Sequence, residues 1–243
     1  MGEQSGDRGG SRGAGPDAQP WRALDVGSPF DYPRQGILYS AAALPPPGRD
    51  GLGSQTLAEI VELVDAAGGG ALGLFSSRAG AVAAAAALRE ARPGLPVFCQ
   101  DEGHLAQLVR SFIADPRASL FGTLSLWQGL DVPGDTCRLV LIDRIPFPRP
   151  DDPVLSARAR VVAQAGGNGF LSVSAAHAAL LLAQGAGRLI RRDTDRGVVA
   201  ILDSRLATAR YGPYLRASLP PLWPTTDGQL VRAALRRLAG GPT

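Results

Sequence analysis

The sequence predicts a single α/β domain in which helices cover both faces of a largely parallel sheet. Three observations support this prediction. The chain has 243 residues, of which 45% are hydrophobic, so it can bury a substantial core. Its apolar runs are short and continuous, as in strands that are buried on both faces. These runs alternate with segments of helical periodicity, which is the order expected of a parallel sheet.

Two segments in the first third of the chain are poor in large apolar side chains. Residues 1–20 are rich in Gly, Ser, Arg, Asp and Gln, and we expect them to form a disordered tail. The Pro- and Gly-rich stretch at 45–53 is typical of an extended surface connection. A helix is then predicted over 55–67, with Ser54 as its N-cap and three glycines after its last residue.

From residue 71 onward, predicted strands and helices follow one another in turn. The apolar runs predict strands at 71–75, 96–99, 118–121, 138–142 and 197–202. The helical spacings predict helices at 79–91, 104–114, 154–164 and 173–191. We therefore expect one domain over residues 21–223, followed over 224–243 by a C-terminal appendage that contains one amphipathic helix.

Cysteine, histidine and hydropathy patterns exclude several classes of protein. Cys99 and Cys137 are too few for a disulfide framework, a four-thiolate iron–sulfur cluster or a Cys-rich zinc site, and we expect them to fill a core. His104 and His177 are the only histidines, so no metal site is predicted. No run approaches the roughly 20 apolar residues that cross a bilayer, and no signal-peptide core follows Met1, so the expected compartment is cytoplasmic with no membrane partner.

The identity of the basic residues is more informative about function than the net charge. A formal charge of +3 permits binding to a polyanion without arguing for it. However, all 25 basic residues are arginine. Without a lysine the chain has no P-loop of the GxxxxGK[ST] type, whose lysine reaches the terminal phosphates of ATP. The chain is therefore not a self-sufficient ATPase of that kind.

The segment QGAGRLIR at 184–191 carries the strongest candidate site. Gln184, Arg188 and Arg191 have helical i, i+4 and i+7 spacing, so one face of the predicted helix presents all three. Guanidinium groups on an otherwise apolar segment favour an anionic partner such as phosphate. The alternative is that Arg188 and Arg191 pair with Asp193 or Asp195 at the end of the helix.

Loops after two predicted strands offer a second candidate surface. Hydroxyl and backbone donors of this kind hold a phosphate chain without reading its sequence, although ordinary capping of strand ends is the alternative. The residues concerned are Ser76, Ser77, Arg78, Thr123 and Ser125. In the same region Gly129 permits a close backbone approach, and Asp131 accepts hydrogen bonds from a ribose or orders its own turn.

Two of these segments carry a family resemblance. QGAGRLIR at 184–191, followed by DRGVVAILDSR at 195–205, resembles motif VI and the next strand of the DinG/XPD branch of superfamily-two helicases. FGTLSLWQGLDVPG at 121–134 is similar to motif V of that branch. The one visible departure is Gln128, which stands where much of the family has Glu, so a role for that carboxylate is not carried over.

Three further segments extend the resemblance to about residues 23–223. RIPFPRPDDP at 144–153 is similar to the Pro-rich loop after motif V, and LFSSR at 74–78 resembles motif IV. SPF at 28–30 is similar to the entry to this domain in the family. The ordered series implies a RecA-like, P-loop NTPase-like domain, namely the second motor domain of an ATP-dependent DNA helicase.

The resemblance implies how this domain acts. It would close against an N-terminal helicase domain with ATP and Mg²⁺ between them, and Arg188 and Arg191 would be its catalytic residues. Gln184, Gly129 and Asp131 would bind the nucleotide. The loops that contain Ser76, Ser77, Arg78, Thr123 and Ser125 would hold single-stranded DNA. The P-loop, the acidic motif and the iron–sulfur cysteines would belong to the first domain, so no iron–sulfur cluster is expected in this chain.

Two alternatives remain open from the sequence. The chain could be a non-catalytic module derived from a helicase, which binds single-stranded nucleic acid or regulates another protein. DNA binding without ATPase activity, even after the missing half is added, would favour that reading. It could also be an unrelated nucleotide-binding enzyme, which tight ATP binding by the isolated chain would favour, whereas we expect that affinity to be weak.

Overall fold

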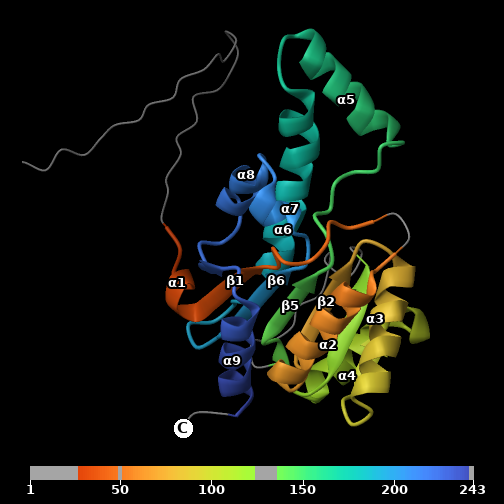
Figure 1. Ribbon diagram of the computed structural model, residues 1–243, viewed down its shortest axis with the longest axis vertical. Helices are drawn as coiled ribbons and strands as arrows, with labels where there is room; N and C mark the ends of the chain where they lie inside the picture. The colour runs from red at the N-terminus through yellow and green to blue at the C-terminus, as the bar shows by residue number, and fades with distance from the viewer. Residues whose placement is uncertain (1–26, 49–50, 124–135, 241–243) are drawn as a thin grey trace, which may run out of the picture.

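The computed structural model describes residues 27–48, 51–123 and 136–240 (Figure 1). Seven strands form one parallel sheet in the order β3-β4-β2-β5-β6-β1-β7. They are β1 (Gly36–Ser40), β2 (Ala71–Phe75), β3 (Val97–Cys99), β4 (Ser119–Thr123), β5 (Leu139–Ile142), β6 (Gly197–Ile201) and β7 (Trp223–Thr225). The predicted disordered tail, residues 1–20, lies outside the described ranges.

Helices cover both faces of the sheet, which confirms the predicted fold class. Those that bury side chains against one face are α2 (Ser54–Ala67), α3 (Arg78–Ala91) and α9 (Gly228–Ala239). Those that bury side chains against the other are α4 (Leu105–Ala114), α6 (Ala176–Ala186), α7 (Arg205–Thr208) and α8 (Gly212–Ala217). The elements α1 (Tyr32–Gln35), the 3-10 helix η1 (Gln100–Glu102), α5 (Pro153–Gln164) and the π-helix η4 (Phe170–Ala175) complete the described fold.

The central strands are apolar on both sides because each side meets a different core cluster. In β5, Val140 and Ile142 belong to the cluster that contains α6, whereas Leu139 and Leu141 belong to the cluster that contains α2 and α3. Successive side chains of a strand point to opposite faces, so a continuous apolar run is required here. This requirement explains why the sequence predicts these strands correctly.

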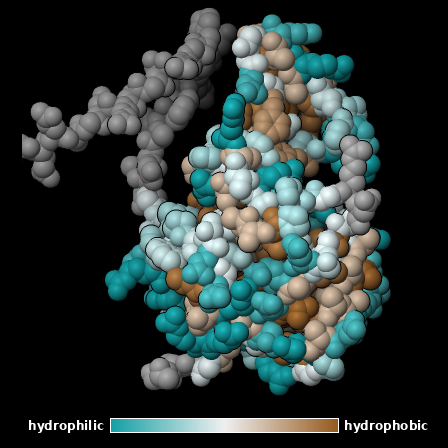
Figure 2. Space-filling model, viewed as in Figure 1, coloured by the Kyte–Doolittle hydropathy of each residue, from teal (hydrophilic) through white to brown (hydrophobic). Residues whose placement is uncertain are grey.

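An arm made of α5 and η4 extends beyond the ends of the strands (Figure 1). It follows the loop after β5, and the chain returns through α6 to the start of β6. Val154 and Val161 on α5 are among its exposed apolar side chains, and Figure 2 shows apolar surface on this arm. The arm therefore stands over the end of the sheet at which the strands finish.

The structure corrects two predicted helix boundaries. Ser54 is the first residue of α2 and Gly53 is its N-cap, so the prediction of Ser54 as the cap is wrong. The single helix predicted over 173–191 is also wrong, because a π-helix precedes α6 and α6 ends at Ala186. Beyond that point the backbone N–H groups of Arg188 and Leu189 bond to carbonyls three residues back, which closes a tight turn.

The last part of the chain packs against the sheet. The strand β7 pairs with β1, and the predicted division at residue 224 falls inside it. Val231 and Leu235 of α9 are fully buried in the cluster that also contains α2. No helix in the described ranges is long and apolar enough to cross a membrane.

Gly69, in the turn after α2, occupies a position that no other residue fits. Its φ is +87°, and a Cβ atom there would lie 1.8 Å from the carbonyl oxygen of Arg117. We expect Gly69→Ala to lower the free energy of unfolding by roughly 2–4 kcal/mol, because backbone strain and a backbone clash add together. Chemical denaturation measures this loss.

Gly94 provides the matched control for Gly69. It has no atom within 4 Å of a built Cβ and no positive φ. Gly94→Ala is expected to change the free energy of unfolding by less than about 0.5 kcal/mol. Equal stability of the two variants would contradict the close approach of Gly69 to Arg117.

Candidate functional site

The predicted site residues lie at opposite ends of the sheet. Ser76 and Thr123 stand at the C-terminal ends of β2 and β4, whereas Arg188 and Arg191 precede the N-terminal end of β6. A five-residue strand is about 16 Å long, so these are two separate surfaces. Three predicted site residues lie outside the described ranges, namely Ser125, Gly129 and Asp131.

The first surface is the arginine loop, residues 187–196, which joins α6 to β6. Leu189 and Ile190 are buried in the core and anchor the loop, while the flanking Arg188 and Arg191 are half-buried. Gln184 lies exposed in the last turn of α6. The prediction that one helical face presents the three residues is therefore wrong, because both arginines follow the end of the helix.

Asp195 fixes the backbone of the arginine loop. Its Oδ2 atom accepts hydrogen bonds from the backbone N–H groups of Arg191, at 2.7 Å, and of Arg192, at 2.8 Å. Asp195 is itself buried. The carboxylate thus holds the chain at the position of Arg191 in one conformation.

Gln35, at the end of α1, holds the following residues of the loop. Its Nε2 atom donates to the carbonyl oxygens of Arg192 at 2.8 Å, Asp193 at 3.0 Å and Asp195 at 3.3 Å. Gln35 is only 4% exposed. Arg196 NH1 also donates to the carbonyl oxygens of Asp193 and Asp195, at 2.7 and 2.8 Å, so Gln35 and Arg196 hold this part of the loop together.

Removing the Gln35 amide is therefore expected to destabilise the fold. We expect Gln35→Ala to lower the free energy of unfolding by about 1–3 kcal/mol, because the loop loses three hydrogen bonds from a buried amide. Gln35→Glu should cost more, since a carboxylate would face three carbonyl oxygens. Denaturant unfolding measures both, with Arg34→Ala as the exposed neighbouring control. Unfolding of Gln35→Glu at the parent midpoint would contradict this role.

The second surface lies where the strands end. Ser76 donates through its backbone N–H and its Oγ to Asp143, at 2.8 and 2.7 Å. The Oγ atom of Ser77 accepts from Gly80 N and so caps the N-terminus of α3, whereas the alternative drawn from the sequence was capping of strand ends. Thr123 donates through its backbone N–H and Oγ1 to Oε1 of Gln100, at 2.9 and 3.1 Å.

Arg78 begins α3 and is the most exposed cation of the predicted set. Its Nε atom lies 3.5 Å from Oδ1 of Asp101, and its side chain is 72% exposed. A surface pair of this kind is weak, so the guanidinium can exchange partners. Arg78 is therefore available to an anion that approaches the start of α3.

Two buried aspartates, which the sequence analysis missed, organise this surface. Asp143, directly after β5, is 3% exposed and accepts from Ser76 and from Nε of Arg144, at 3.3 Å. Burial raises the pKa of the Asp143 carboxyl, while Ser76 and Arg144 lower it. Arg144 also donates to the carbonyl oxygen of Gly48 at 3.1 Å, which fixes its direction.

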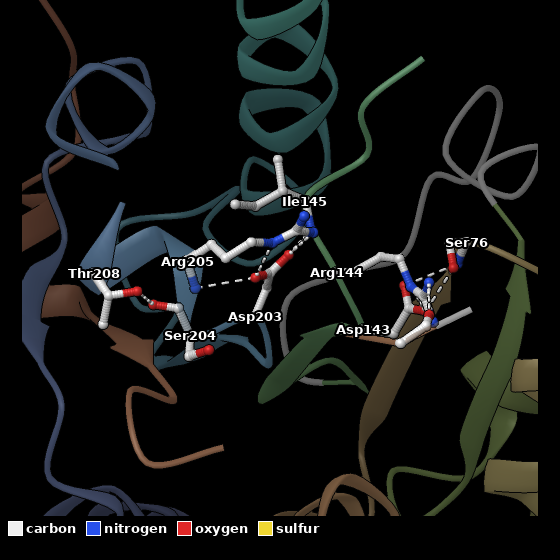
Figure 3. A network of polar contacts seen from close by, with 9 residues as sticks. Ser76, Asp143, Arg144, Ile145, Asp203, Ser204, Arg205 and Thr208 are labelled. Atoms are coloured by element: carbon white, nitrogen blue, oxygen red, sulfur yellow. Dashed lines mark hydrogen bonds and ion pairs between the residues drawn. The ribbon is translucent and has the colours of Figure 1, made fainter. Parts of the chain in front are cut away.

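Asp203 has the same role after the neighbouring strand β6. It is fully buried and accepts from Ile145 N at 2.9 Å and from the backbone, Nε and NH2 of Arg205 at 3.1, 2.9 and 2.7 Å. Figure 3 shows the two aspartates and their arginines side by side. Together with Ser76 these four residues form the strand-end network.

The strand-end network has the chemistry of a phosphate-binding surface. Arg144 and Arg205 are both partly exposed, and each is held by a buried carboxylate on its own strand end. Neighbouring strands lie about 4.8 Å apart, so the network offers cationic and hydroxyl groups at regular steps along one edge. An apolar strand followed by Asp-Arg or Asp-x-Arg is the sequence signal that could have identified it.

Comparisons with known proteins identify the family of this chain. The family described as "Helicase C-terminal domain" matches residues 60–222. Over 221 residues the chain is 68% identical to the "ATP-dependent helicase DinG" of Mycobacterium tuberculosis, covering 90% of this chain and 33% of that protein. It is 41% identical over 217 residues to the "ATP-dependent DNA helicase YoaA" of Escherichia coli, covering 89% of this chain and 34% of that protein.

Solved structures show the same fold at low sequence identity. One titled "XPD_APO" superposes with a TM-score of 0.55 at 18% identity, covering 81% of this chain and 40% of that one. The chain spans about a third of the length of the curated relatives above. With a family match over most of the described sheet and close relatives named DinG, this chain belongs to the helicase C-terminal domain family, in its DinG/XPD branch.

Proposed function

We propose that this chain is the second motor domain of an ATP-dependent DNA helicase, which contributes an arginine finger and single-strand contacts to a two-domain motor. The observation that carries the proposal is the arginine loop, in which two half-buried arginines stand on a backbone fixed by Asp195 and Gln35. The absence of lysine from the chain agrees with a domain that completes an ATP site rather than building one.

The arginine loop fits the terminal phosphates of ATP. ATP with Mg²⁺, held mainly by a first RecA-like domain, supplies the γ-phosphate that is transferred to water. Arg188 and Arg191 keep their charge in a half-buried setting, and their guanidinium groups fork onto phosphate oxygens. Their role is to stabilise the negative charge that develops on the phosphate during hydrolysis. Gln184, with Gly129 and Asp131 from motif V, is assigned to nucleotide binding.

The strand-end network fits the backbone of single-stranded DNA. Ser76, Arg78 and Thr123 are assigned to this contact, together with Ser77 and Ser125. Arg144 and Arg205 add two fixed cations to the same edge. These groups contact phosphate and sugar and read no bases, as translocation over any sequence requires. Closing and opening against the N-terminal helicase domain would then couple ATP hydrolysis to movement along the strand.

Binding of the isolated chain to a fluorescent oligothymidine tests the DNA half of this proposal. Arg144→Gln is expected to weaken binding by roughly three- to tenfold. It should also reduce the slope of log K against log salt by about 0.7, because one phosphate contact is lost. Fluorescence anisotropy at several salt concentrations measures both quantities.

Arg149→Gln is the matched control for this experiment. Arg149 is an exposed arginine that pairs only with the exposed Asp151 among its described contacts. Its replacement should leave the affinity within about twofold and the slope unchanged. Equal losses in the two variants would mean that general charge, rather than the strand-end network, binds the oligonucleotide.

A further inference from the structure

Three aromatic rings meet beside the strand-end network. Phe147 comes from the loop after β5, Phe170 from the start of η4, and Tyr211 from the turn before α8. The ring centroids lie 5.4 Å apart for Phe147 and Phe170, 5.4 Å for Phe147 and Tyr211, and 5.3 Å for Phe170 and Tyr211. We call this group the aromatic trio.

Two rings of the trio are fixed by the core, and the third ring is exposed. Phe147 and Tyr211 pack against the buried core cluster, so their positions are fixed. Phe170 rests on both rings yet remains 42% exposed. It also opens a π-helical segment, a rare geometry that is frequent at functional sites. Packing between the arm and the rest of the domain explains why Phe147 and Tyr211 are aromatic. It gives no role to the exposed face of Phe170.

Arg205 connects the trio to the strand-end network. Its Cζ atom lies 5.8 Å from the centroid of the Phe147 ring, within the range of a cation–π contact. The same guanidinium donates to Asp203 at 2.9 and 2.7 Å. A fixed cation therefore stands directly beside an aromatic surface, which is the combination found where proteins bind single-stranded nucleic acid.

We propose that the aromatic trio is a stacking site for a base of single-stranded DNA, with Phe170 as the ring that contacts the base. Arg205 binds a phosphate of the same strand. This inference rests on the proposed function, because it needs the strand to run along the edge that carries Ser76, Arg144 and Arg205. It adds a base contact to a surface that otherwise holds only the backbone.

The chemistry around the trio favours a nucleic acid over a protein as the occupant. An apolar protein segment would match Phe170 but would bring no negative charge for Arg205 and Arg144. A nucleotide carries both complements, a flat ring and an anionic phosphate separated by one sugar. Stacking accepts any base because every base has a π-face, so the site remains compatible with movement over all sequences.

The test uses the full chain and a fluorescent oligothymidine. Phe170→Leu keeps an apolar side chain but removes the ring, and it is expected to weaken binding about tenfold. Phe170→Tyr keeps the ring and should bind within about twofold of the parent. The salt dependence should be unchanged in both, because the ring carries no charge. Val161→Ala, an exposed apolar residue elsewhere on the arm, is the matched control and should bind as the parent.

Photo-crosslinking of the parent chain to an oligothymidine that carries 5-iodouracil provides a second readout without any substitution. Mass spectrometry should find the adduct on Phe170 or Tyr211. If the parent chain binds the oligonucleotide but Phe170→Leu binds equally well and the adducts lie elsewhere, the stacking site is wrong while the proposed function stands. If the parent chain binds no single-stranded DNA at all, both fail.

Discussion

Replacing Arg191 with alanine is expected to lower kcat for DNA-stimulated ATP hydrolysis by about a thousandfold or more. The measurement uses this chain fused to the remaining part of the mycobacterial DinG relative, with a coupled phosphate-release assay. The loss should fall on kcat, because the guanidinium stabilises charge that is present only in the transition state. Affinity for single-stranded DNA should stay within about twofold, since Arg191 lies at the opposite end of the sheet from the strand-end network.

Two variants control the Arg191 experiment. Arg192→Ala changes the next residue of the same loop, an exposed arginine, and should leave turnover near the parent rate. Arg191→Lys keeps the charge but loses the planar fork, so most of the activity should remain lost. Parent-like turnover by Arg191→Ala would overturn its assignment as an arginine finger.

Replacing Asp203 with alanine is expected to lower the free energy of unfolding by about 3–5 kcal/mol. The change leaves the backbone N–H of Ile145 without its acceptor and the Arg205 guanidinium without its carboxylate. For a chain of this size, such a loss lowers Tm by roughly 6–20 °C. Calorimetry measures the shift, and single-strand binding at a temperature where the variant is folded should also be weaker, because Arg205 is no longer held in place.

Asp151→Ala is the matched control for the Asp203 experiment. Asp151 pairs with Arg149 at 3.0 Å, but both side chains are well exposed. A surface pair of this kind contributes less than about 1 kcal/mol. A Tm for Asp203→Ala as high as that of Asp151→Ala would show that the strand-end network does not stabilise the fold.

The central strands could be predicted because burial on both faces forces a continuous apolar run. The two strands that escaped prediction have weaker signals. β1 directly follows the short helix α1, and β7 is an edge strand that contains Pro224. A proline removes a donor and is tolerated only at such an edge. The strand order depends on long-range pairing, which no local pattern in the chain encodes.

The sequence singles out candidate site residues, and these stay predictions, but it does not show how the structure arranges them. Arg188 and Arg191 form part of a contiguous motif, yet their helical spacing is misleading because α6 ends before both. Gln35 lies 157 residues before the first carbonyl that it holds, so no sequence window shows the contact. The two buried aspartates directly follow apolar runs in the sequence, at the ends of β5 and β6. Their hydrogen-bond partners can be identified only when the strands are placed side by side.

The most direct test of the motor-domain proposal is ATP hydrolysis by the chain with and without an N-terminal helicase domain. Alone, the chain should hydrolyse no ATP. Joined to that domain, supplied by fusion or in trans, it should support hydrolysis that single-stranded DNA stimulates. Hydrolysis by the chain alone would contradict the proposal. A joined protein that binds single-stranded DNA but hydrolyses no ATP would also contradict it, and would favour a non-catalytic binding module instead.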